Sequence, residues 1–111
     1  MKISDKYILE GHKAVACEDL LVWALWFETH SAERIIKQET VGQWWVSTVF
    51  LGLDHSMSRD GVKPLIFETM VFGVNIGRRP RSELTRRCST WEEAEAQHAK
   101  VVKLLKRAMV N

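Results

Sequence analysis

The segments "VSTVFLGLDH", residues 46–55, and "PLIFETMVFG", residues 64–73, decide the fold of this chain. Both are rich in β-branched and aromatic residues, and a polar segment containing Asp60-Gly61 separates them. This pattern predicts two neighbouring antiparallel strands. Because alternate residues point to opposite faces, both faces of each strand are apolar. We therefore expect central strands that helices or a partner subunit cover on both sides.

Glu68 lies in the middle of the second of these apolar segments. Two registers of the hairpin are considered, with Leu53 opposite Ile66 or with Gly52 opposite Glu68. The first places Glu68 on the same surface as His55, and the second places it beside Asp54. An unpaired buried carboxylate is costly, so we expect Glu68 to be held by His55 or His98.

These ionisable residues form a candidate polar cluster: Asp54, His55, Glu68 and His98. Mixed histidine and carboxylate ligands suit zinc or manganese, so a metal-dependent hydrolase or metal-binding protein that uses these four residues is one alternative. A structural alternative exists for each of them. Glu68 could face solvent, Asp54 and His55 could stabilise a turn at a strand end, and His98 could be a hydrogen-bonded core histidine.

The rest of the chain supplies further elements around the two strands. Residues 7–17 predict a short hairpin or an extended arm turning at Gly11. Helices are predicted over residues 18–32 and 90–109, an outer strand over residues 34–42, and a short strand over residues 84–88. The last helix has Thr90 and Glu93 at the positions of a capping box. The order predicts a single α+β domain over residues 1–111, with an antiparallel sheet of three to five strands and two packed helices.

Composition limits the function. The chain has 111 residues, 46% of them hydrophobic and 27% charged, which is typical of one soluble domain. Cys17 and Cys88 make no disulfide framework, and neither a signal peptide nor a membrane span is recognisable, so we expect a cytoplasmic protein without a membrane partner. The common zinc, phosphate-loop and nucleophile motifs are absent from the sequence. We therefore assign no catalytic residue and no cofactor, and we favour a protein that is not an enzyme.

Arginines are concentrated in "RRPRSELTRR", residues 78–87. This segment predicts an anion-binding loop, with Trp44 as an additional aromatic contact. The alternatives are that the arginines form a solvated loop and that Trp44 is a packing or interface residue. The candidate anion-binding residues are Arg78, Arg79, Arg81, Arg86, Arg87 and Trp44. Nucleic-acid binding through the same loop is a second alternative, although no known nucleic-acid-binding motif accompanies it. Five tryptophans and two doubly apolar strands also predict a homodimer.

Three segments, "VSTVFLGLDHS", "PLIFETMVFG" and "CSTWEEAEAQHAKVV", resemble small uncharacterised proteins of tailed phages and prophages. The resemblance covers residues 46–104, and its shared positions are Asp54, His55, Phe67, Glu68, Thr69 and His98. This chain has Gln97 where those proteins have a glycine before the helix histidine. The resemblance implies a phage accessory protein in the host cytoplasm that blocks a host protein or sequesters an anionic nucleotide signal.

Overall fold

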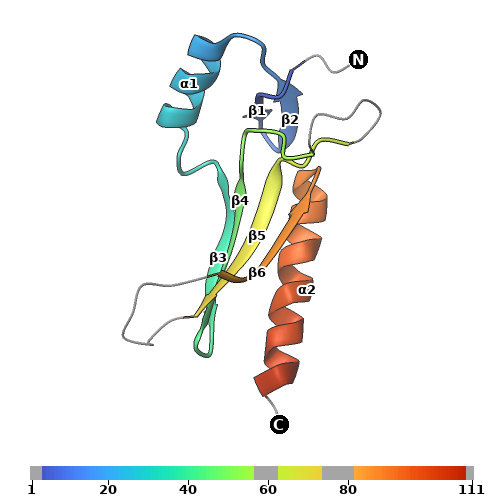
Figure 1. The fold of residues 1–111 in the computed structure, drawn as a ribbon. Coiled ribbons are helices and arrows are strands. Elements are labelled where there is room, and N and C mark those ends of the chain that lie inside the picture. The colour runs from blue at the N-terminus through green and yellow to red at the C-terminus, as the bar shows by residue number, and fades with distance from the viewer. Residues whose placement is uncertain (1–3, 57–62, 74–81, 110–111) are drawn as a thin grey trace.

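The computed structural model describes residues 4–56, 63–73 and 82–109 (Figure 1). The elements in chain order are β1 (Tyr7–Glu10), β2 (Lys13–Ala16), α1 (Leu20–Thr29), β3 (Ile35–Val41), β4 (Trp44–Phe50), β5 (Phe67–Gly73), β6 (Ser82–Cys88) and α2 (Trp91–Met109). Two antiparallel sheets result, one of β1 and β2 and one with the order β3-β4-β5-β6. The α+β prediction is confirmed.

The central hairpin has a register that the sequence analysis did not foresee. Val49 lies opposite Glu68 and Thr48 lies opposite Thr69, so both predicted registers were wrong. The reason is that β4 ends at Phe50 and the chain turns at Gly52, whose φ is +77°. Beyond Gly52, Leu53 pairs with Lys6 of the N-terminal segment, while His55 N–H still donates to the Leu65 carbonyl.

Helix α2 lies along one face of the four-stranded sheet (Figure 1). It starts as predicted, because Glu93 N–H donates to Thr90 Oγ1 at 3.1 Å and Thr90 N–H donates to Glu93 Oε1 at 3.2 Å. Two apolar clusters lie between α2 and the sheet. One is built from Leu9, Phe50, Ile66, Phe67, Trp91 and Ala94, and the other from Val41, Val46, Val71, Val101 and Val102.

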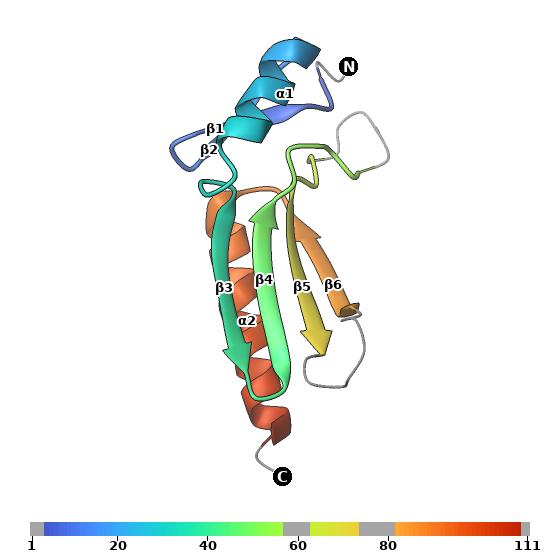
Figure 2. The same ribbon diagram turned by 90° about the vertical axis from the view of Figure 1, so that its left-hand side faces the viewer.

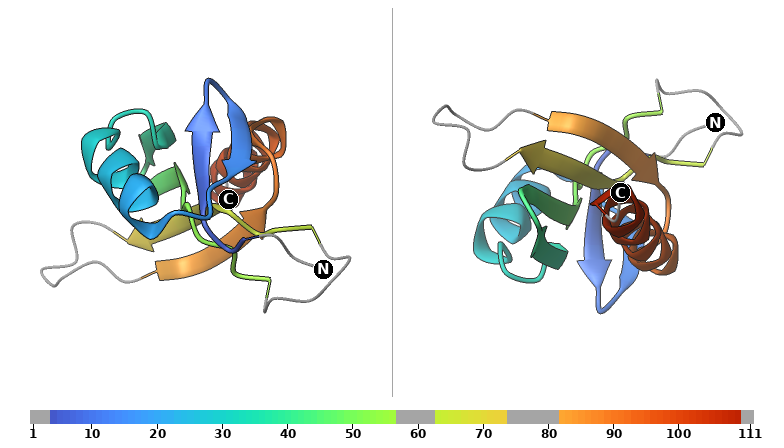
Figure 3. Two further views of the ribbon diagram at one scale, coloured as in Figure 1. Left: turned by 90° about the horizontal axis from the view of Figure 1, so that it is seen from above. Right: turned by 90° about the horizontal axis from the view of Figure 1, so that it is seen from below.

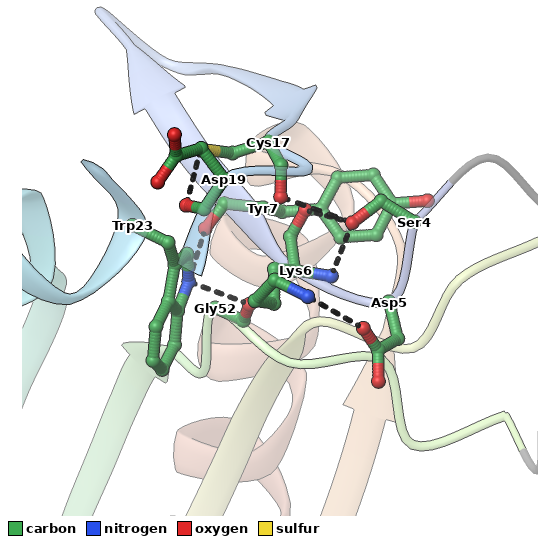
Figure 4. A network of polar contacts seen from close by, with 8 residues as sticks. All are labelled: Ser4, Asp5, Lys6, Tyr7, Cys17, Asp19, Trp23 and Gly52. Atoms are coloured by element: carbon green, nitrogen blue, oxygen red, sulfur yellow. Dashed lines mark hydrogen bonds and ion pairs between the residues drawn. The ribbon is translucent and has the colours of Figure 1, made fainter. Parts of the chain in front are cut away.

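Helix α1 occupies a different place, at the end of the sheet. It begins after Asp19, whose Oδ1 accepts hydrogen bonds from the N–H groups of Leu21 and Val22. The indole N–H of Trp23 donates to the carbonyls of Tyr7 and Gly52, both at 3.1 Å (Figure 4). These bonds attach α1 to β1 and to the turn after β4.

Gly52 is required at this attachment for two reasons. Its positive φ disfavours residues with a Cβ, and a Cβ here would lie 3.0 Å from the Phe27 ring. The close approach lets Phe27 and Trp26 pack on the end of β4, where Trp26 meets Phe50 edge-on. The other side of α1 packs on nothing among the described residues. Leu21 is 80% exposed, so within a single chain only one side of α1 is packed.

The sheet face opposite α2 is likewise uncovered by any helix or strand in the described part of the chain. Figure 2 shows this face, with α2 behind the four strands. Alternation places Trp45, Ser47 and Val49 on it from β4, and Glu68, Met70 and Phe72 from β5. The expectation that both faces are covered therefore holds for only one of them within a single chain.

Candidate functional site

The candidate polar cluster does not assemble. Glu68 lies on the uncovered face, where Arg87 is its cross-strand neighbour and donates from Nε to Glu68 Oε2 at 2.9 Å. His98 projects from α2 onto the opposite face. The prediction that a histidine holds Glu68 was therefore wrong. The arginine replaces it, because the true register places Arg87 directly opposite the carboxylate.

Asp54 and His55 have the local role that the structural alternative describes. Asp54 Oδ1 accepts from the N–H groups of Ser56 and Leu65, at 2.8 and 3.0 Å. The His55 side chain is exposed, and its backbone N–H donates to the Leu65 carbonyl. Within residues 4–56, 63–73 and 82–109, no group of three or more histidine, cysteine, aspartate or glutamate side chains could hold a metal ion. The metal alternative therefore has no ligand set there.

The predicted arginine loop is only partly described. Arg78, Arg79 and Arg81 lie outside the described residues. Arg86 and Arg87 belong to strand β6, where adjacent positions point to opposite faces, and Arg87 is paired with Glu68. These two arginines therefore do not form one loop surface.

Trp44, predicted as an exposed aromatic contact, packs half-buried against the valine cluster under α2. The cause is again alternation: Trp44 shares the α2 face with Val46, whereas Trp45 faces the uncovered side. Trp44 therefore has the packing role, and its contact with an anion stays a prediction.

A chain of hydrogen bonds crosses the interface between α2 and the sheet at His98. His98 is 1% exposed, its Nδ1 lies 2.7 Å from Thr48 Oγ1, and its Nε2 lies 2.7 Å from Glu39 Oε2. Thr48 Oγ1 lies 2.7 Å from Thr69 Oγ1, and the Gln97 amide donates to Thr69 Oγ1 at 3.0 Å. The chain thus joins α2, β3, β4 and β5.

For a neutral His98 ring, one direction of proton donation fits all four contacts. A carboxylate only accepts, so His98 Nε2–H donates to Glu39. With a neutral imidazole, Nδ1 accepts from the Thr48 hydroxyl, and Thr48 in turn accepts from the Thr69 hydroxyl. Thr69 accepts from Gln97, so each group in the chain has a partner. Gln97 thus supplies the first donor.

Glu39 is the charged residue at one end of this series of hydrogen bonds. The hydrogen bond from His98 is the main cause that lowers the pKa of Glu39 from its ordinary value of 4.5. Partial burial opposes this shift, while Lys37, with its ammonium 3.5 Å from Glu39 Oε2, supports it. Glu39 is therefore ionised at neutral pH, and it fixes the direction in which protons are donated along the series of hydrogen bonds.

Carboxylate, imidazole and hydroxyl in this order are the parts of a nucleophilic triad. Here, however, both Thr48 and Thr69 are 0% exposed and lie between the sheet and α2. A nucleophile must reach its substrate, so this arrangement has no route to catalysis. The hydrogen bonds instead hold α2, β3 and the central strands in fixed positions relative to one another.

A groove of about 510 Å³ opens where Glu39 and His98 meet the surface, between β3 and the C-terminal half of α2. Its floor includes Ala99 and Val102. Its remaining lining is basic, and consists of Lys37, Lys103, Lys106 and Arg107. The site therefore combines a short apolar surface with four cations and one carboxylate that is already paired.

Sequence reasoning missed this groove. His98 was identified, but Glu39, Thr48 and the four cations were not. The basic residues at the end of α2 were interpretable as partners of the helix dipole. A usable signal was the spacing of Ala99, Val102, Lys103 and Lys106, which places them along one side of a helix.

No described helix is long and apolar enough to cross a membrane. Comparison of the chain with protein-family models, with curated proteins and with solved structures gave no match. The argument for function therefore rests on the geometry of the groove and of the surfaces around it.

Proposed function

We propose that this protein is a non-enzymatic binding module that holds a small anionic ligand in the groove between β3 and α2. The observation that carries this proposal is the lining: four cations surround an apolar floor, and the neighbouring carboxylate is engaged by His98 and Lys37. Cations grouped in a concave site attract anions more strongly than the same charges on a flat surface.

The groove also supports a ligand class. Its volume lies within the range of about 300–1,000 Å³ that small-molecule sites occupy. Ala99 and Val102 offer an apolar contact to the body of a ligand, while the lysines suit phosphate oxygens. A nucleotide has both parts. The resemblance to tailed-phage proteins supports the version in which the protein sequesters an anionic nucleotide signal in the host cytoplasm and so counteracts host defence.

The hydrogen-bond chain supports binding without catalysis. It anchors the walls of the groove from below, because His98 belongs to α2 and Glu39 belongs to β3. A preorganised site binds at a lower entropic cost than one that must be ordered by its ligand. We therefore expect the backbone of β3 and α2 to move little on binding.

Titration with three probes tests the proposal: adenosine triphosphate, a cyclic dinucleotide and inorganic phosphate. We expect saturable binding of at least one nucleotide, with NMR shifts at Lys37, Ala99 and Lys103. Phosphate alone should bind at least about tenfold more weakly, because it leaves the apolar floor unused.

Two variants of equal charge provide the control. Lys103→Glu/Lys106→Glu reverses two cations of the groove and should weaken nucleotide binding at least about tenfold. Lys63→Glu/Lys100→Glu reverses two exposed lysines outside the groove and should leave binding within about twofold. If both variants lost nucleotide affinity equally, the overall charge of the protein and not the groove would explain the binding. Preference for a single-stranded oligonucleotide over every nucleotide would favour nucleic-acid binding instead.

A further inference from the structure

Helix α1 is apolar from Leu20 to Phe27 and polar only at its last two residues, Glu28 and Thr29, yet it lies on the outside of the chain. Its sequence, "LLVWALWFET", contains no lysine or arginine, and none of its residues is buried. Trp23, Trp26 and Phe27 face the end of the sheet. The four aliphatic residues that are more than half exposed are Leu20, Leu21, Val22 and Leu25. A helix without a polar side normally lies inside a protein, so α1 indicates a surface that something else covers.

The uncovered sheet face lies on the same side of the molecule as α1. Figures 1 and 3 show α1 and α2 on opposite sides of the sheet. At the end of the face far from α1, Trp45 and Phe72 form an aromatic pair with centroids 5.6 Å apart. Trp45 and Phe50 are five residues apart on β4, which separates this pair from α1 by about 17 Å along the strand. We call α1 and this sheet face together the open side.

Charge argues against a lipid surface as the occupant. Helices that lie on membranes carry lysines and arginines beside their apolar side, whereas the residues flanking and ending α1 are acidic: Glu18, Asp19 and Glu28. On the sheet, Glu68 and Arg87 neutralise each other. Among the residues that the structure describes, the open side thus offers apolar contact without a net positive charge.

The area of the open side fits a protein interface. Four strands about 23 Å long and about 4.8 Å apart project an area of roughly 450 Å². A ten-residue helix, about 15 Å long and about 10 Å wide, adds roughly 150 Å². Because side chains make the surface uneven, its accessible area exceeds these projected areas and approaches the ~800 Å² that each partner buries in a standard interface.

We propose that a second copy of this chain covers the open side in a two-fold symmetric dimer. A two-fold contact requires that each patch on one copy meets a complementary patch on the other. The open side has two such patches: α1 protrudes at one end, and the Trp45–Phe72 pair lies at the other. Placed face to face and antiparallel, each α1 sets Leu21 and Leu25 on the Trp45–Phe72 pair of the partner subunit.

The arrangement also accounts for Glu68. Residues near the middle of the sheet face, including Met70, meet their equivalents close to the two-fold axis. Glu68 and Arg87 are already paired within one chain, so they enter the interface without an unpaired charge. Polar side chains at the β3 border of the face, such as Thr40, remain at the rim.

The mass of the full chain in solution tests this proposal. Light scattering at micromolar concentration should give twice the 12.8 kDa of one chain. Leu21→Glu/Leu25→Glu places charge in the proposed contact, and should weaken dimerisation at least about 30-fold. Both residues are exposed in the single chain, so the fold should persist, as circular dichroism would verify. The matched control is Leu104→Glu, an exposed leucine of α2 on the other side of the sheet, which should keep the dimer mass.

A charge exchange tests the antiparallel geometry. Trp45→Lys alone should weaken the dimer, while Trp45→Lys combined with Leu21→Glu should recover at least about tenfold of the lost affinity through a new ion pair between the copies. Absence of recovery would overturn the contact between α1 and the partner's Trp45. A monomeric wild-type chain would overturn the dimer, and flotation of that monomer with vesicles of neutral phosphatidylcholine would assign α1 to a lipid surface.

Discussion

Replacing Thr48 by valine removes the middle of the hydrogen-bond chain and keeps the shape of the side chain. Thr48 is 0% exposed and contacts both Thr69 and His98 at 2.7 Å. The substitution leaves two buried polar atoms unpaired: the Thr69 O–H, which loses its acceptor although Thr69 Oγ1 still accepts from Gln97, and His98 Nδ1, which loses its donor. Each such group costs about 1–3 kcal/mol, and the added methyl returns about 0.8 kcal/mol. We expect Thr48→Val to lower the free energy of unfolding by about 2–4 kcal/mol.

The direction of donation predicts how a second substitution acts. Thr69→Val alone leaves the Thr48 hydroxyl donating to His98, so it should cost only about 1 kcal/mol. In the double variant, the hydroxyl of Thr69 no longer lacks an acceptor and only His98 Nδ1 is unpaired. The double variant should therefore be more stable than Thr48→Val alone.

Urea denaturation followed by tryptophan fluorescence measures these differences at one fixed protein concentration. The control is Thr40→Val, the same substitution at an exposed position of β3, which should change stability by less than about 0.5 kcal/mol. A cost below about 1 kcal/mol for Thr48→Val, or simple additivity of the two core substitutions, would refute the proposed direction of the chain.

Three further outcomes follow from described contacts. The pKa of Glu39 is lower in the folded chain than its ordinary value of 4.5. The ionised carboxylate therefore stabilises the fold above pH 4.5, and this stabilisation is lost as the pH falls through the folded-state pKa. When the free energy of unfolding is measured against pH, wild type and Glu39→Gln should differ mainly above pH 4.5. Burial, assisted by the charge of Glu93, raises the pKa of the Cys88 thiol to about 11. Iodoacetamide at pH 8 should therefore modify Cys88 about two orders of magnitude more slowly in the folded chain than in urea, as peptide mass spectrometry would measure. A double-mutant cycle of Glu68→Ala and Arg87→Ala should give a coupling of about 1 kcal/mol that weakens in high salt, because the arginine is partly exposed; a coupling of zero would make the pair incidental.

The sequence by itself determined the elements and their faces. The capping box at Thr90 and Glu93 and the apolar period of the last helix depend on neighbours three or four residues away. The alternation that separates Thr69 from Glu68 is likewise a property of any extended backbone. These features are local, so the α+β class, the N-terminal hairpin and the α2 helix were predictable.

Tertiary structure decided which side chains meet. The register of β4 and β5 depends on the turn at Gly52 and on pairing with the N-terminal segment, and it gave Glu68 an arginine instead of a histidine. His98 and Glu39 are 59 residues apart in the chain, so no local pattern joins them. Helix α1 has no polar stripe, so its sequence could not indicate which side faces the sheet. Contacts between distant segments settle these points, because packing selects one of several arrangements that local geometry permits equally.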